Sequence, residues 1–282
     1  MNKREVASEV LPTIWRVPDE LWTIAEPILR PAEHPKGGRP WMDTRRVLDG
    51  VLYVLRTGCQ WRALPREFGP ATTVHDRFQR WVATGALQRL WQACLQRYGQ
   101  EQGIQWAWQA ADGCLVKAPL PPKTRTPAAA VGPNPTDRGK DGSTRHVLTE
   151  GRGVPMATIV TAANVNDHTA LPELLDARIA VAPPRVERPG LCVDAAYDNA
   201  LTEELIVAAD YTPHIRRRGE ARPPHDPRVE PRRWPVERTH AWHNRFRRLL
   251  IRWEKKAENW LALIHLANAL IAFRACYWIV TG

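Results

Sequence analysis

Hydrophobic residues recur at helical spacing through residues 19–98, which predicts a series of helices. The first helix follows Asp19, and the Pro- and Gly-rich stretch 35–40 ends it. Asp43 is placed to cap a second helix, which is expected to end near Gly58. The apolar positions expected to face inward in these two helices are Leu21, Trp22, Ile24, Ile28, Val47, Val51, Leu52, Val54 and Leu55.

A third helix is predicted after residue 70, with Thr73 as its cap and Asp76 in its first turn, where the helix dipole favours negative charge. A fourth helix follows Gly85. The third helix turns apolar residues inward, namely Val74, Phe78, Trp81 and Val82. It leaves polar residues on its outer face, namely His75, Arg77, Gln79 and Arg80. This pattern fits a helix-turn-helix that enters a DNA major groove, and it fits a helical bundle with a solvated face equally well.

The pattern changes in residues 104–215 to short apolar runs that are typical of strands. The Pro-, Ala- and Gly-rich stretch 119–135 has no periodicity and is expected to be a loop. Strands are predicted at 105–116, 146–148, 156–161 and 191–194, and helices at 166–175 and 199–209. Three strands, a helix, a strand and a helix make a mixed α/β order.

The C-terminal part is predicted to be irregular over residues 212–235 and helical from Val236 onward. A break is expected around residues 254–258, before a last apolar helix that ends at Trp278. On one continuous helix from Val236, four arginines share an arc of about 80°. They are Arg238, Arg245, Arg248 and Arg252. An apolar stripe occupies the neighbouring arc and would face the sheet.

Composition narrows the class of protein. The hydrophobic fraction of 44% suits a globular chain with a proper core, and the net charge of +10 favours a phosphate polymer or an anionic membrane as partner. Five scattered cysteines, none in a CxxC pair, argue against a disulfide framework or a zinc knuckle and favour a reducing cytoplasm. The start of the chain shows no signal peptide, and the apolar segment 260–273 is too short to span a bilayer.

Two aspartates stand out in the predicted strands. Asp112 lies inside an otherwise uncharged strand, and Asp194 ends a short apolar strand beside two alanines. A lone charge in a buried strand is costly unless it is paired or binds a metal ion, and ligand sites gather at strand ends. Either residue taken singly could be a turn or cap residue. The two together make a metal site plausible.

Glu237 lies at the start of the predicted C-terminal helix, beside the arginine stripe. The ordinary interpretation of such a glutamate is a partner for the helix dipole. The neighbouring arginines favour a second one, because guanidinium groups bind phosphate oxygens in pairs and would hold a DNA backbone against a metal-binding carboxylate.

Several motifs, in this order and spacing, resemble the bacterial insertion-sequence transposases of the four/five group. The resemblance covers about residues 15–275. Its motifs are GCQWRALP (58–65) with FGP (68–70), ADGCLVKA (111–118), GPNPTDRGK (132–140), NVND (164–167), VDAAYD (193–198), RWPVERT (233–239) and RRL (247–249).

The resemblance implies an RNase H-like mixed-sheet core at 104–282, preceded by an all-helical DNA-binding domain at 1–98. Asp112 would lie on the first strand of that core, Asp194 after the fourth, and Glu237 on the following helix. In the family's glutamate signature Arg233 and Glu237 fit. The sequence departs from that signature at Glu230, where the family has Tyr, and at Asn244, where it has Lys and where Arg245 follows one residue on. The departure affects only accessory contacts to the DNA end.

The implied activity is DNA transposition by a two-metal mechanism. Asp112, Asp194 and Glu237 would hold two Mg²⁺ ions, with Mn²⁺ as a substitute, because oxygen-only ligands select these ions. Water would free a 3′-hydroxyl at the transposon end, and that hydroxyl would attack target DNA. The candidate DNA-contacting residues are His75, Arg77, Arg80, Arg233, Arg238, Arg245, Arg248 and Arg252.

The expected partners are the terminal inverted repeats and the target duplex. A homodimer on paired ends, a cytoplasmic, nucleoid-associated location and no membrane binding are also expected. Three alternatives remain open at this point: a nuclease of the same fold that cuts without joining, a decayed or regulatory DNA-binding protein, and a membrane-surface protein, against which the missing amphipathic anchor argues.

Overall fold

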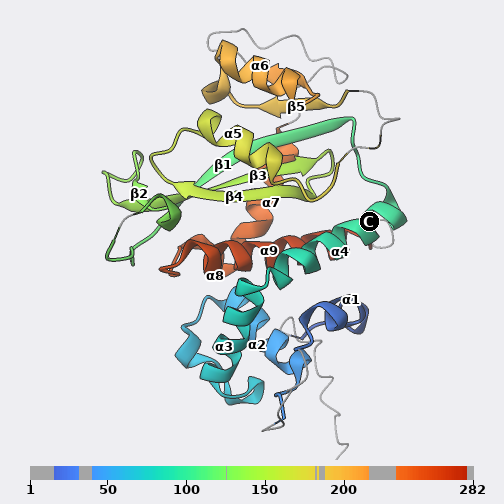
Figure 1. The fold of residues 1–282 in the computed structure, drawn as a ribbon, viewed down its shortest axis with the longest axis vertical. Helices are drawn as coiled ribbons and strands as arrows, with labels where there is room; N and C mark the ends of the chain where they lie inside the picture. The colour runs from blue at the N-terminus through green and yellow to red at the C-terminus, as the bar shows by residue number, and fades with distance from the viewer. Residues whose placement is uncertain are drawn as a thin grey trace, which may run out of the picture.

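The computed structural model describes residues 16–31, 40–124, 126–181, 183, 188–215 and 233–277 (Figure 1). The N-terminal helices gather at one end of the molecule, a mixed sheet with helices on both faces lies beyond them, and the C-terminal helix α9 runs between the two. Most of the predicted 35–40 break, most of the predicted irregular stretch 212–235, Glu230 and Trp278 fall outside the described ranges.

The predicted N-terminal helices are all present. They are α1 (Asp19–Leu29), α2 (Thr44–Thr57), α3 (Ala71–Ala83) and α4 (Ala86–Gln102), with the short helices η1 (Trp61–Ala63) and η2 (Arg66–Phe68) between α2 and α3. Asp43 caps α2 as predicted, since its side chain accepts a hydrogen bond of 2.7 Å from the Arg46 amide. Gly58 ends α2 with a φ of 71°, and Gly85 precedes α4 with a φ of 65°. These left-handed conformations favour glycine at both helix boundaries.

The start of α3 differs from the prediction. The helix begins at Ala71, with Pro70 at the N-cap position and no side-chain cap, so the prediction that Thr73 caps it is wrong. The proline ring fixes φ near −62°, which starts the helix two residues before the predicted cap. Val74, Phe78 and Trp81 are buried as expected, whereas Val82 is only partly buried.

One hydrophobic core joins the N-terminal helices to the far end of the chain. Helix α9 (Ala257–Ala275) packs along α4, and its residues share a core cluster with α1–α4. Trp91 of α4 stacks on His265 of α9, with ring centroids 5.3 Å apart. The segment suspected of being membrane-like is therefore a buried terminal helix, as predicted. None of the helices described combines the length and apolar content that crossing a bilayer requires.

The strands form one mixed sheet. They are β1 (Trp108–Lys117), β2 (Gly132–Pro133), β3 (Asp141–Glu150), β4 (Pro155–Ala162), β5 (Gly190–Val193) and β6 (Thr212–Ile215). On one edge, strand β1 pairs antiparallel with β3, and β3 pairs antiparallel with β4. On the other edge, β1 pairs parallel with β5, and β5 pairs parallel with β6. Apart from the two-residue β2, this is an RNase H-like mixed sheet. The sequence missed β6 and underestimated the length of β3.

Helices cover both faces of the sheet (Figure 1). They are α5 (Asp167–Asp176), α6 (Ala200–Ala208), α7 (Trp234–Asn244) and the short α8 (Arg247–Leu250), together with α9. Ala111, Leu148 and Val193 belong to one core cluster with the leucines of α5. Their sequence neighbours Ala110, Val147 and Cys192 belong to another cluster with Val236 of α7. Because neighbouring strand residues point to opposite faces, α5 and α7 lie on opposite sides of β1.

The C-terminal helix from residue 236 is not continuous, which contradicts the prediction. Helix α7 ends at Asn244, and buried Phe246 takes an extended conformation before α8 begins. Ile251 then forms an isolated bridge with Lys117 at the end of β1. The apolar periodicity persists through this break because Phe246 and Leu249 still pack into the core. Residues after 244 therefore do not follow the helical wheel that placed four arginines on one face.

Candidate active site

The topology sets Asp112 and Asp194 side by side. Strands β1 and β5 run parallel in a register that pairs Ala110 with Cys192. Continued by two residues, that register places Asp194, the first residue after β5, next to Asp112. The Asp194 carboxylate is close enough to raise the pKa of Asp112. The two aspartates singled out in the sequence therefore lie on neighbouring strands, close enough for their charges to interact.

Asp112 is a largely buried carboxyl group, 15% exposed, with a perturbed pKa. Burial is the main reason that its pKa rises to about 6, and the carboxylates of Asp194 and Asp167 raise it further. Arg233 opposes this rise, since its Nη2 lies 3.2 Å from Asp112 Oδ2. A carboxyl group held near neutrality by burial and by like charges is typical of a site that binds cations or transfers protons.

His240 of α7 completes the surroundings of Asp112, with its Nε2 3.8 Å from Asp112 Oδ2. Burial, and then the charge of Arg145, lower the pKa of His240 to about 3, so the ring is neutral. Its Nδ1 lies 3.4 Å from an Arg145 Nη2 donor, which assigns the proton to Nε2, on the side of Asp112. Sequence reasoning missed this residue, because a histidine among the polar residues of a helix gives no signal of its own.

Asp194 has a local structural role as well as its place beside Asp112. Its Oδ1 accepts a hydrogen bond of 2.8 Å from the Ala196 amide and caps the short helix η4 (Ala195–Tyr197). The side chain is half-buried. The ordinary interpretation as a cap residue is thus partly correct, and it is compatible with a role for the second oxygen in binding a ligand.

Glu237 lies in the first turn of α7, on the same side of the sheet as Asp112. Its neighbour Val236 is buried against Cys192, while the Glu237 side chain is exposed. Burial raises the pKa of the Cys192 thiol to about 12, and the carboxylates of Glu237 and Asp112 add to this rise. Both charges therefore lie near the same thiol.

The three predicted ligands do not form a closed cluster. Within the described ranges, no three Asp, Glu, His or Cys side chains lie close enough together to hold an ion as they stand. The structure brings Asp112 and Asp194 near one another and places Glu237 on the adjoining helix α7. The triad remains a prediction.

Three of the arginines predicted to contact DNA are buried and serve the fold. Arg77 bonds Thr44 Oγ1 at 3.0 Å and lies over the Trp41 ring. Arg248 is held by Glu254 at 2.6 Å, and Arg252 donates to the carbonyl groups of Ala129 and Ala130 at 2.7 Å. The prediction that these three side chains face outward is wrong. Arg77 turns inward because its partner Trp41 comes from a segment outside α3. Arg248 and Arg252 turn inward because α7 ends at Asn244, so they do not lie on the predicted helix face.

The remaining candidates lie at least partly in solvent. Arg80 and Arg245 are exposed, while His75 and Arg233 are half-buried. The Arg238 side chain makes contacts within the protein. Its guanidinium lies over the rings of Trp234 and Trp242 and donates to the Arg152 carbonyl oxygen.

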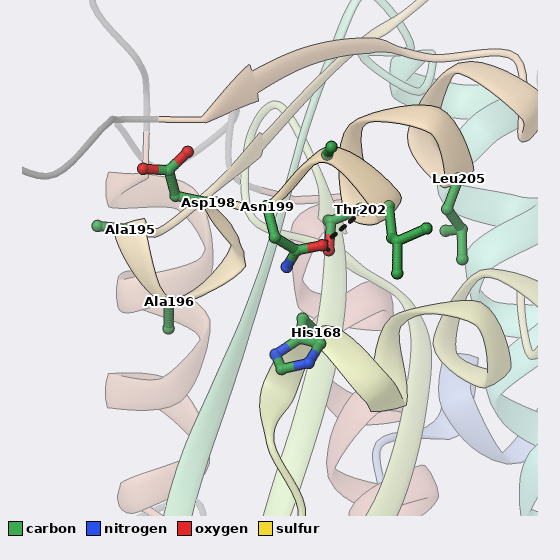
Figure 2. A pocket seen from close by; sticks show the side chains of 9 residues that line it. His168, Ala195, Ala196, Asp198, Asn199, Thr202 and Leu205 are labelled. Carbon is green, nitrogen blue, oxygen red and sulfur yellow. Dashed lines mark hydrogen bonds between the residues drawn. The ribbon is translucent and has the colours of Figure 1, made fainter.

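An open hollow lies beside the residues that directly follow Asp167 and Asp194 (Figure 2). It is lined from two sides: His168 at the start of α5, and Ala195, Asp198 and Asn199 after β5. In Figure 2 the His168 ring lies below the turn that carries Asn199, whose side chain caps α6 by accepting a 2.9 Å hydrogen bond from the Thr202 amide. The hollow therefore separates the residues that directly follow Asp167 and Asp194.

Two family descriptions match the chain. Residues 17–91 match the family described as "Putative transposase of IS4/5 family", and residues 109–272, more than half of the chain, match the family described as "Transposase DDE domain". These two matches correspond to the helical region and to the sheet with its surrounding helices.

Two curated relatives come from one insertion element of Burkholderia cepacia. The "Putative transposase for insertion sequence element IS402" is 40% identical over 147 residues, which are 51% of this chain and 68% of the relative. The "Insertion element IS402 uncharacterized 16.2 kDa protein" is 32% identical over 133 residues, 43% of this chain and 90% of the relative. Among solved structures, the crystal structure of the Mos1 mariner paired end complex with Mn is similar, with 97% of this chain and 86% of that chain covered at 11% identity and a TM-score of 0.33. A TM-score this low adds no support. The two family matches and the 40% identical relative are sufficient: the chain belongs to the DDE transposase family, and it is a DNA transposase.

Proposed function

We propose that this transposase is a metal-dependent enzyme in which Asp112, Asp194 and Glu237 hold two divalent cations, Mg²⁺ or Mn²⁺. It hydrolyses the phosphodiester at the transposon end to expose a 3′-hydroxyl, and then transfers that hydroxyl into target DNA. The observation that carries the proposal is the pair of adjacent carboxylates Asp112 and Asp194, one of them buried with its pKa raised to about 6.

The residues fit a divalent cation in charge and in chemistry. The partly buried negative charges of Asp112 and Asp194 lie beside one another, with Arg233 as the cation paired with Asp112. Uncompensated buried charge is costly, and a divalent cation would remove that cost. The donors are carboxylate oxygens, which suit Mg²⁺ and Mn²⁺. Glu237 extends this donor set from α7.

When bound, the two cations would activate the attacking oxygen and stabilise the leaving oxygen of an in-line displacement at phosphorus. The protein's own groups do the positioning. Asp112 is fixed in the middle of β1, and neutral His240 presents an N–H toward it. Arg233 has one nitrogen on Asp112, and its buried Nε has no partner in the described ranges. Arg233 can therefore hold the carboxylate and bind a phosphate oxygen with its remaining donors.

Double-stranded DNA, both the terminal inverted repeats and the target, is the proposed partner. The net charge of +10 supports it, and the accessible basic residues Arg80, Arg233 and Arg245, with His75, are the candidate contacts. Two ends must be brought together for transposition, so we propose a homodimer on paired ends, working at the nucleoid.

The test is cleavage of a duplex that carries the element's own terminal repeats, with Mg²⁺ present. Asp112→Asn, Asp194→Asn and Glu237→Gln should each lower the cleavage rate by about a thousandfold or more, as expected for groups at the reacting centre. DNA binding should persist in all three. The matched control is Asp176→Asn, which changes an exposed aspartate at the end of α5.

Retained cleavage in one variant removes that residue from the triad. Pre-cut ends distinguish the alternatives: failure to join them to target DNA would indicate a nuclease that only cuts. Binding without any metal-dependent cleavage by the unsubstituted protein would indicate a decayed or regulatory protein.

A further inference from the structure

A third aspartate reaches the Asp112–Asp194 pair from the opposite face of the sheet. Asp167 is the first residue of α5. Its carboxylate lies against Gly113, the residue after Asp112, so closely that a Cβ on Gly113 would be 2.5 Å from Asp167 Oδ1 and 2.9 Å from Oδ2. Only a glycine at position 113 leaves room for this carboxylate. The side chain is 24% exposed, so the group is largely removed from water.

No described cation neutralises Asp167 through an ion pair. His146 Nδ1 lies 3.5 Å from Asp167 Oδ1, but burial lowers the pKa of His146 to about 4, so this ring is neutral. The other ring nitrogen lies 2.8 Å from Thr161 Oγ1. The Nδ1 atom makes no hydrogen bond within the described ranges. The neutral His146 ring therefore lies beside the Asp167 carboxylate without compensating its charge.

The three aspartates interact with one another. Burial, followed by the carboxylate of Asp194, raises the pKa of Asp167, and the charge of His168 opposes that rise. Asp194 and Asp167 both raise the pKa of Asp112 as well. Among the described residues, Arg233 is the arginine in an ion pair with one of these three carboxylates, that of Asp112. The region carries an excess of negative charge that would attract a cation.

A buried hydroxyl group gives independent support. Tyr197 is fully buried, and within the described ranges its phenolic oxygen has no hydrogen-bond partner. Burial, and then the carboxylates of Asp167, Asp112 and Asp194, raise its pKa well above the usual value, so all three charges act on this hydroxyl. A buried hydroxyl without a partner is costly, and an ion with its bound water beside these carboxylates would give it one.

We propose that Asp167 is a fourth carboxylate of the divalent-cation site, reaching it from α5 while Glu237 reaches it from α7. This inference rests on the metal-dependent chemistry proposed above. The side chains as they stand form no closed cluster of three ligands within the described ranges. Asp167 would therefore bind the cation either directly or through a bound water, which Mg²⁺ commonly retains. Tyr197 would donate its hydroxyl hydrogen to the same group.

The rival interpretation is structural: an aspartate at the start of a helix is favoured by the helix dipole. The two readings predict opposite effects of Asp167→Asn on the full-length protein in EDTA. Removal of a helix-start charge would lower the melting temperature. Removal of one of three mutually repelling carboxylates should raise it. Asp176→Asn, on the exposed far end of the same helix, is the matched control. It should change neither the melting temperature nor the Mn²⁺ affinity.

The second measurement is Mn²⁺ affinity, followed by calorimetric titration of the protein without DNA. Asp167→Asn should weaken Mn²⁺ binding by about tenfold or more, the range seen when groups around a metal site are removed. An unchanged Mn²⁺ affinity in this variant, whatever its melting temperature, overturns the inference. A melting temperature that falls in EDTA, with affinity unchanged, establishes the helix-start role instead.

Asp194→Asn, measured in parallel, separates the two proposals. If it loses Mn²⁺ binding while Asp167→Asn does not, the proposed function stands and this inference fails. If the unsubstituted protein binds no Mn²⁺, or Asp194→Asn binds it unaltered, both fail, because the metal site itself is then not where the two aspartates meet.

Discussion

Arg233 Nη2 lies 3.2 Å from Asp112 Oδ2, which joins the residue preceding α7 to a carboxylate in the middle of β1. The same helix carries Glu237 one turn further on and His240 beyond it. Binding a cation at Asp112 would weaken this ion pair, because the cation and the guanidinium compete for one carboxylate. The Arg233–Asp112 ion pair therefore makes the position of the start of α7 depend on whether a cation is bound at Asp112.

The first prediction concerns pH. The pKa of Asp112 is raised to about 6, mainly by burial, so its carboxyl group is protonated below that pH and cannot bind a cation. At Mg²⁺ concentrations below saturation, where protons and the cation compete for Asp112, single-turnover cleavage should fall by about tenfold per pH unit below pH 6. Arg233→Gln removes the group that opposes the rise in the pKa of Asp112, so the fall in the cleavage rate should begin at a higher pH. Arg188→Gln, which removes an exposed arginine paired with Asp210, is the control. If the cleavage rate of this variant begins to fall at the same pH as that of the unsubstituted protein, Arg233 does not influence Asp112.

The second prediction concerns stability. The pKa of Asp112 is higher in the folded protein than its usual value of 3.8, so the folded state binds more protons between about pH 4 and pH 6. Stability therefore falls as pH rises through this window and stays lower above it. In EDTA at pH 8, Asp112→Asn should be more stable than the unsubstituted protein by about 1–3 kcal/mol, and the difference should vanish below about pH 4. Urea unfolding at the two pH values measures this. A destabilised variant at pH 8 would contradict it.

The sequence singles out Asp112 and Asp194 as candidates because each is a charge among small and apolar residues, a local pattern that does not depend on the tertiary fold. It also identified the caps of α2 and the positions of most strands. Glu237 could be identified only through the family resemblance, since a glutamate in the first turn of a helix is common. Its exposed position in the structure leaves its role to experiment.

The arginines could not be placed from the sequence. The helical wheel assumed one helix from Val236, but the chain leaves the helix at Asn244 and turns Arg248 and Arg252 inward. Arg248 pairs with Glu254, beyond the end of α8, and Arg252 donates to the remote residues Ala129 and Ala130. Asp167 was missed for a similar reason. At the start of a helix it resembles an ordinary dipole partner, and its place beside Gly113 depends on the packing of α5 across β1.

The third prediction separates structural from DNA-binding arginines. Arg248 and Glu254 form a buried pair with side chains 7% and 3% exposed, so Arg248→Ala leaves a buried charge without its partner. It should destabilise the protein by about 3–5 kcal/mol. Arg245→Ala changes an exposed residue three positions earlier and should leave stability almost unaltered. It should instead weaken DNA binding and reduce the salt dependence by about one phosphate contact. If Arg245→Ala leaves the salt dependence unaltered, Arg245 does not contact DNA.

The last prediction uses Gly113 to displace Asp167 without changing its chemistry. A Cβ at position 113 would lie 2.5 Å from Asp167 Oδ1, so Gly113→Ala should push this carboxylate aside. If Asp167 takes part in the cation site, Gly113→Ala should weaken Mn²⁺ affinity by about tenfold while the chain still folds.

The double variant Gly113→Ala/Asp167→Asn decides whether the effect passes through the carboxylate. When two substitutions act through the same interaction, their effects do not add. The double variant should therefore bind Mn²⁺ about as weakly as Asp167→Asn alone. Additive losses would show that Gly113→Ala acts by distorting β1, and with it Asp112, and not through Asp167.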